Sequence, residues 1–80
     1  MLRWVFARNG RTLTCELDAR GRHTFDVSLV PHWNLSASVV ERFHDAVAAM
    51  ERHAALARAL REAGWVVVNH AAARDLRTAA

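Results

Sequence analysis

Residues 4–27 alternate apolar and polar side chains across two turn signals, and this alternation constrains the fold more than any other feature of the sequence. A period of two is typical of strands that bury one face. Asn9-Gly10 is the strongest short hairpin signal, because a type I′ turn needs positive φ at both residues. Pairing outward from that turn places Arg8 opposite Arg11 and brings three apolar pairs onto one face: Phe6–Leu13, Trp4–Cys15 and Leu2–Leu17.

A second turn signal, Arg20-Gly21-Arg22, predicts a third strand that ends at Pro31, which cannot donate to a ladder. A three-residue loop at this turn gives the pairs Phe25–Leu17, Val27–Cys15 and Leu29–Leu13. The polar face then carries Arg3, Val5, Thr12, Thr14, Glu16, Asp18, Thr24, Asp26 and Ser28.

Glu16 and Asp26 lie opposite each other in this arrangement, and Arg3 pairs with Glu16 on the same face. Two adjacent carboxylates serve acid–base chemistry when an enclosed pocket raises one pKa. A flat sheet face offers no such enclosure, so we expect these carboxylates to form a solvated row.

Residues 36–43, SASVVERF, admit two interpretations. Ser38 and Glu41 match a capping box, which predicts that a helix starts here. A helix continuing to Ala63 would be about 37 Å long, whereas strands of seven residues span about 23 Å. A fourth strand followed by a helix with Asp45 as N-cap avoids that overhang, and the adjacent valines favour a strand. We therefore favour the strand.

From Ala46 onward, apolar residues recur at helical spacing until Gly64, a natural C-terminal stop. The stripe consists of Ala46, Ala49, Met50, His53, Leu56, Ala57, Leu60 and Ala63. WVVVN, residues 65–69, is either a last short strand or an apolar strap, and residues 70–80 are expected to be a frayed tail.

These elements predict an α+β fold: an antiparallel meander of three or four strands with one amphipathic helix packed on one face, and the option of a short C-terminal strand. The domain would span residues 1–69. The expected core is Trp4, Phe6, Leu13, Leu17, Phe25, Val27, Phe43, Met50, Leu56 and Leu60.

The same residues carry a resemblance to a known group. The pattern W-x-F-x-R-x-G-x-x-L-x-C-E, here residues 4–16, is followed by V-E-x-F-x-D at residues 40–45 and G-W at 64–65. The chain resembles a group of small uncharacterised bacterial proteins over residues 4–65. The resemblance supports the fourth strand and a helix start at Asp45, and it implies no activity. The chain departs from the group at PHWNLSAS, where an Asp-Gly type of turn is expected.

Composition says more about the cellular compartment of the protein than about its function. The chain has 80 residues, a formal charge of +3 and one cysteine, and all of its basic residues are arginine. One cysteine cannot form an internal disulfide, which fits a reducing cytoplasm. No apolar run has the length of a signal peptide or of a membrane span, so we expect a cytoplasmic protein without membrane contact. The modest charge identifies no partner by itself.

The sequence predicts no catalytic, cofactor or metal site. His44 and His53 are nine residues apart, and no C-x-x-C or H-E-x-x-H motif is present. Cys15 lies among apolar neighbours, which do not activate a thiol. No glycine-rich phosphate loop and no nucleophile elbow occur. We therefore expect a protein that is not an enzyme.

Two binding functions remain. The first is a protein-interaction module, for which a homodimer is one option. Its contact surface would be an open sheet edge or the apolar residues Trp33, Trp65 and Val67. The alternative is weak nucleic-acid binding through the hairpin turns, at Arg8, Arg11, Arg20 and Arg22. The two turns should lie at opposite ends of the sheet. A salt titration separates the two functions, since only phosphate binding falls steeply with salt.

Overall fold

The structure, a computed structural model, describes residues 2–72, with the backbone alone for residues 70–72. The Asn9-Gly10 turn forms as expected, with φ of 51° and 76°. It joins β1 (Leu2–Arg8) to β2 (Arg11–Ala19). The expected register of this hairpin is confirmed at every pair, including Arg8 opposite Arg11.

The predicted register of the third strand is wrong by two residues. β3 (Phe25–Pro31) places Val27, not Phe25, opposite Leu17. The cause is a loop of residues 20–24 instead of a three-residue loop, closed by a hydrogen bond from the Arg20 amide to the Thr24 carbonyl (2.8 Å). A shift of two keeps each side chain on its expected face, so the division into faces survives the error.

The fourth strand is confirmed, although it is shorter than expected. β4 (Val39–Phe43) pairs with β3, and a short 3₁₀ helix, η1 (Leu35–Ala37), precedes it. The helix α1 (Ala46–Glu62) then begins after the N-cap Asp45, whose carboxylate accepts from the Ala48 amide (3.1 Å). The interpretation in which the helix starts near Val39 is therefore wrong.

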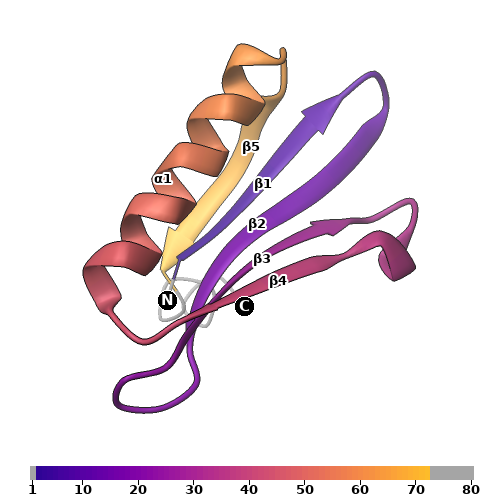
Figure 1. The fold of residues 1–80 in the computed structure, drawn as a ribbon. Coiled ribbons are helices and arrows are strands. Elements are labelled where there is room, and N and C mark those ends of the chain that lie inside the picture. Colours follow the sequence, from indigo (N-terminus) through magenta and orange to yellow (C-terminus); the bar gives the residue numbers. More distant parts are fainter. Residues whose placement is uncertain (1, 73–80) are drawn as a thin grey trace.

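The C-terminal segment forms a fifth strand, β5 (Val66–Ala72), which pairs antiparallel with β1. The sheet order is β4-β3-β2-β1-β5, so α1 carries the chain from one edge across to the other (Figure 1). The α+β class is confirmed, and the fourth strand and the optional C-terminal strand both form, which gives five strands. β5 extends beyond the expected boundary at residue 69, and the rest of the expected tail, residues 73–80, lies outside the described residues.

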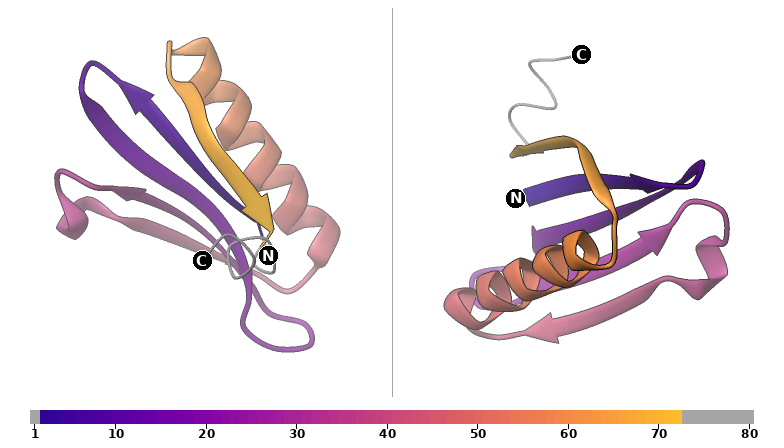
Figure 2. Two further views of the ribbon diagram at one scale, coloured as in Figure 1. Left: turned by 180° about the vertical axis from the view of Figure 1, so that it is seen from behind. Right: turned by 90° about the horizontal axis from the view of Figure 1, so that it is seen from above.

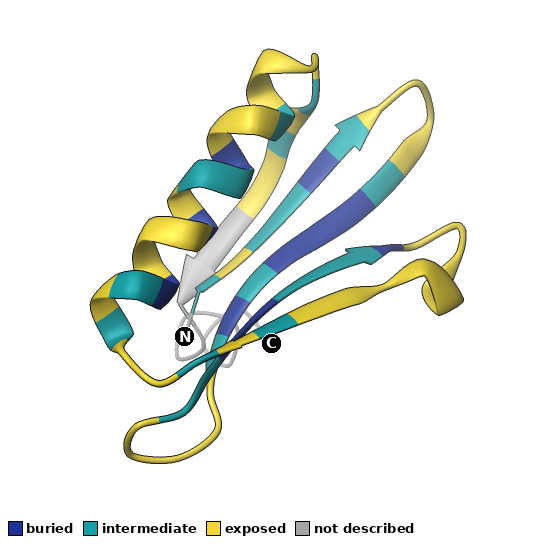
Figure 3. Cartoon of the chain, in the orientation of Figure 1, coloured by how far each residue is buried: buried dark blue, intermediate teal, exposed yellow. Residues whose placement is uncertain are grey.

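One face of the sheet packs against α1, and within residues 2–72 no α-helix covers the other face (Figure 2). The expected core residues lie between sheet and helix, with one exception. Met50 is 53% exposed, because the buried side of α1 is a narrow stripe of Ala49, His53 and Ala57 (Figure 3). Within residues 2–72, no helix combines the length and the apolar character needed to cross a membrane.

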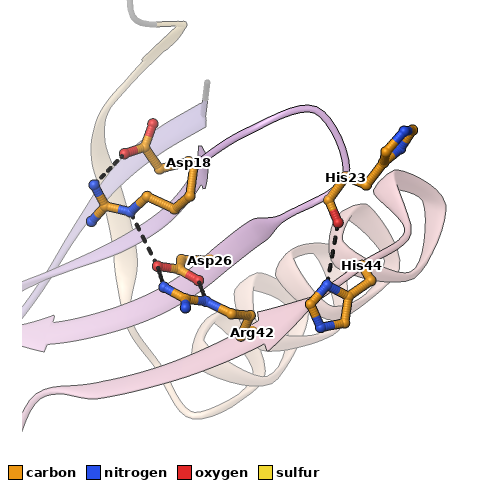
Figure 4. Close-up of polar contacts among 6 residues, drawn as sticks. Asp18, His23, Asp26, Arg42 and His44 are labelled. Carbon is orange, nitrogen blue, oxygen red and sulfur yellow. Dashed lines mark hydrogen bonds and ion pairs between the residues drawn. The ribbon is translucent and has the colours of Figure 1, made fainter.

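The second face of the sheet is not simply exposed to solvent, so the expectation of a solvated row of carboxylates is wrong for Asp26. Asp26 lies opposite Asp18 instead of Glu16 and is only 5% exposed. Arg42, its neighbour on β4, holds both carboxylate oxygens at 2.9 and 3.1 Å (Figure 4). Thr14, also expected to be wet, is buried under the His32 ring, to which its hydroxyl is hydrogen bonded (2.7 Å). This face therefore holds a structural polar network.

Candidate binding site at the first hairpin turn

Five residues from three parts of the chain meet at the end of the sheet that carries the β1–β2 turn. They line a hollow of about 350 Å³, and we call them the tryptophan–arginine cluster: Arg8, Asn9, Arg11, Trp33 and Trp65. Four of them are residues that the sequence singled out, two for a protein partner and two for nucleic acid. The structure brings these two sets together in one site.

Trp65 owes its position to the way α1 ends. The amide of Gly64 donates to the Arg61 carbonyl (3.0 Å), and the amide of Trp65 donates to the Leu60 carbonyl (2.9 Å). These two bonds form a Schellman motif, which needs a residue of positive φ at Gly64 (97°). The motif turns the chain back onto the sheet, so the Trp65 ring packs beside the core.

Trp33 is held at the same end by a turn after β3. The His32 amide donates to the Thr12 carbonyl (3.0 Å), and the Asn34 amide donates to the Pro31 carbonyl (3.2 Å). Trp33 stacks on Trp65 with the ring centroids 5.9 Å apart and the planes 11° from parallel. Trp33 still exposes 46% of its surface.

The two arginines follow from the register of the first hairpin. Arg8 and Arg11 lie directly opposite each other and are both exposed. The Arg11 guanidinium lies 5.0 Å from the centre of the Trp33 ring, a cation–π contact. Arg8 crosses Gly64 closely: a Cβ at that position would lie 3.1 Å from Arg8 Nε. Gly64 is thus required for its backbone conformation, and a side chain there would also displace Arg8 slightly.

In the part of the chain that the structure describes, the charge of the cluster has no local counter-charge. Among the described residues, neither Arg8 nor Arg11 forms an ion pair with a carboxylate, and no acidic side chain lines the hollow. Two like charges directly opposite each other on paired strands destabilise the pairing. An anion bound between them would relieve that repulsion.

The arginines of the second turn are placed differently. The β2–β3 loop lies at the opposite end of the sheet from the cluster, as expected (Figure 1). There Arg20 Nε pairs with Asp26 (3.1 Å), and its Nη1 lies 3.6 Å from Asp18. Arg22 is exposed in the same loop. Of the two arginines in this loop, Arg20 is therefore paired with carboxylates of its own chain, unlike Arg8 and Arg11.

The third residue proposed for a protein partner, Val67, does not reach the cluster's surface. It is partly buried and packs against the core, whereas its neighbours Val66 and Val68 are 62% and 57% exposed. The alternation along β5 explains this difference, because neighbouring residues of a strand face opposite sides.

The cysteine and histidine side chains that the sequence raised as candidates for catalysis or metal binding have structural roles. Burial raises the pKa of the Cys15 thiol to about 11, so the thiol is not activated. His53 Nε2 donates to the Cys15 carbonyl oxygen (3.2 Å) inside the core, and His44 Nδ1 donates to the His23 carbonyl oxygen at the far loop (3.3 Å, Figure 4). Nowhere in residues 2–72 do three or more histidine, cysteine or acidic side chains gather as a metal site would require.

Comparison of the chain with models of protein families, with curated proteins and with solved structures finds no match.

Proposed function

We propose that this chain is a non-enzymatic binding module whose tryptophan–arginine cluster binds single-stranded nucleic acid. The observation that carries the proposal is the pair Arg8 and Arg11, placed opposite each other without a carboxylate partner in the described residues, beside the stacked rings of Trp33 and Trp65. Proteins that bind single strands without sequence preference combine these two elements: cations for the backbone and aromatic rings for the bases.

The arginines supply the phosphate contact. A guanidinium binds a phosphate through two parallel hydrogen bonds, and it remains charged at every physiological pH. A phosphate between Arg8 and Arg11 replaces a repulsion with two attractions. The site is at the end of the sheet and is open to solvent, so a chain of nucleotides can continue past it on either side.

The tryptophans supply the base contact. A base that stacks on the exposed part of Trp33 takes the position that the Arg11 guanidinium now occupies, and Arg11 turns to the phosphate. The hollow of about 350 Å³ has the size of a small ligand site. Trp65 holds Trp33 in place from the core side, so the platform is formed before the ligand arrives.

The test is the affinity for a short fluorescein-labelled oligothymidylate, measured by fluorescence anisotropy between about 50 and about 200 mM salt. We expect the affinity to fall steeply with salt. For single strands each phosphate contact contributes about 0.7 to the slope of log affinity against log salt, so the double variant Arg8→Ala/Arg11→Ala, which loses the one phosphate held between the two arginines, should have a slope smaller by about 0.7.

A Trp33→Ala variant should weaken binding roughly 5- to 150-fold, the effect of losing one stacked base. The matched controls are Arg22→Ala, an exposed arginine at the other loop, and Leu35→Ala, an apolar residue that is 65% exposed next to the site. Both controls should bind like the wild type. Absence of binding at low salt, or an equal loss in Arg22→Ala and Arg11→Ala, would contradict the proposal.

A further inference from the structure

The described residues expose apolar side chains unevenly. Nine consecutive residues, 32–40, are exposed, and they contain four of the eight large apolar side chains that are exposed in the described part of the chain. These four are Trp33, Leu35, Val39 and Val40. Trp33 belongs to the cluster described above, and Leu35 lies in η1. Val39 and Val40 are neighbours on β4 and face opposite sides of the sheet, with Val39 opposite Leu29 and Val40 opposite Ser28. Figure 3 shows most of η1 and β4 as exposed.

The two edges of the sheet differ in regularity. The ladder between β1 and β5 is interrupted by a bulge, where Phe6 pairs with Val67 but Val5 pairs with Asn69. A bulge bends an edge and hinders further strand pairing. The ladder between β3 and β4 has no such interruption from Val39 to Phe43. Within residues 2–72, β4 pairs with β3 alone.

The usual protection of an edge strand by charge is also weak at β4. Charged side chains on an edge strand oppose the approach of a second strand. Glu41 is paired with Arg52 of α1 (2.8 Å), and Arg42 is paired with the buried Asp26. Both charges of β4 are therefore balanced within the chain, and the edge presents Val39 and Val40 without a net charge beside them.

We propose that β4 pairs antiparallel with β4 of a second copy of this chain, about a two-fold axis perpendicular to the sheet at Val40. An antiparallel edge is complementary to its own copy, because the two-fold axis reverses the strand direction while keeping the faces. The result is one continuous sheet of two copies, with both helices on the same face. This inference does not depend on the proposed ligand.

The register follows from charge and strand length. An axis at Glu41 would oppose two carboxylates, which is unfavourable. An axis at Val39 would require Ala37 to pair, but Ala37 belongs to η1. An axis at Val40 opposes Val40 to Val40 and extends the ladder from Arg42 to Ser38, which has extended backbone angles (φ −62°, ψ 143°).

The first test is the dissociation constant of the dimer, measured by sedimentation velocity over a concentration series. We expect Val40→Lys to raise it at least about 10-fold, because the substitution places two like charges opposite each other and removes apolar burial. Val66→Lys, the same change on β5 at a residue of similar exposure (62% against 59%), is the control and should associate like the wild type. Circular dichroism checks that both variants remain folded.

The second test is covalent. Directly opposed residues of an antiparallel pair have the spacing that a disulfide accepts, so Val40→Cys should give a cross-linked dimer under mild oxidation. Val66→Cys should not, and the buried Cys15 does not interfere. A wild type that stays monomeric throughout the series, equal effects at residues 40 and 66, or no cross-link in Val40→Cys would overturn the proposal.

Discussion

His53 places an ionisable ring in the contact between helix and sheet. It is buried, donates through Nε2 to the Cys15 carbonyl, and packs edge-on against Trp4 with the ring centroids 5.7 Å apart. Burial lowers the pKa of His53 below its ordinary value of 6.5, an effect that the hydrogen bond to Cys15 partly offsets. The folded state therefore favours the neutral ring.

This lowered pKa predicts a loss of stability in mild acid. At pH values between the pKa of His53 in the folded state and 6.5, His53 is protonated in the unfolded chain but neutral in the folded chain. The free energy of unfolding therefore falls as the pH decreases. Urea unfolding between about pH 7.5 and about pH 5 measures this slope. His53→Gln keeps a donor for the Cys15 carbonyl but cannot titrate, so its slope should be flatter. An unchanged slope would assign the effect to other groups.

Asp26 shows the opposite direction of linkage. The hydrogen bonds from Arg42, with further contributions from Arg20, lower the pKa of its carboxyl below the ordinary 3.8 despite the cost of burial. The carboxylate therefore stabilises the fold above pH 3.8, and this contribution is lost as the pH falls through the lowered pKa.

We expect Asp26→Asn to lower the free energy of unfolding at neutral pH, because Arg42 loses its charged partner and Arg20 keeps only the longer contact with Asp18. The difference from the wild type should narrow as the pH falls below 3.8. The control is Glu41→Gln, since the ion pair of Glu41 with Arg52 is solvent-exposed (side chains 41% and 44% exposed), so its loss should be smaller. Equal losses in the two variants, measured by urea unfolding, would refute a special role for Asp26.

At the scale of elements, the N-cap residue Asp45 determines where α1 begins. The Asp45 carboxylate accepts from the Ala48 amide, which has no partner within the helix. Asp45→Ala should destabilise the protein by about 1 kcal/mol, whereas Asp45→Ser should change it little. Chemical denaturation measures both. If Asp45→Ala is as stable as the wild type, the cap does not determine the start of the helix.

The elements also show what local sequence signals can and cannot predict. Asn9-Gly10 has one compatible turn, so the register of β1 and β2 followed from it. The Arg20-Gly21-Arg22 signal fits loops of several lengths, and the loop actually formed extends to Thr24 because Arg20 bonds to it. The burial of Asp26 was missed for a related reason, because it depends on Arg42, which only the pairing of β3 with β4 brings alongside.

At the scale of the whole molecule, the α+β class followed from periodicity, but the site did not. Trp33 and Trp65 are separated by the whole of β4 and α1. They meet because α1 crosses the sheet and β5 returns beside β1, a choice of edge that no local signal contains. The sequence offered the exposed tryptophans and the hairpin arginines as separate candidates for different functions. The sheet order makes them neighbours.

The most direct test of the proposed site is the indole N–H signals of the three tryptophans, followed by NMR as a short oligothymidylate is added. Trp33 and Trp65 line the site, whereas Trp4 packs against the core and His53. We expect the signals of Trp33 and Trp65 to shift at low salt and to return at high salt, while the signal of Trp4 stays in place. Three unmoved signals, or a shift of Trp4 alone, would contradict binding at the tryptophan–arginine cluster.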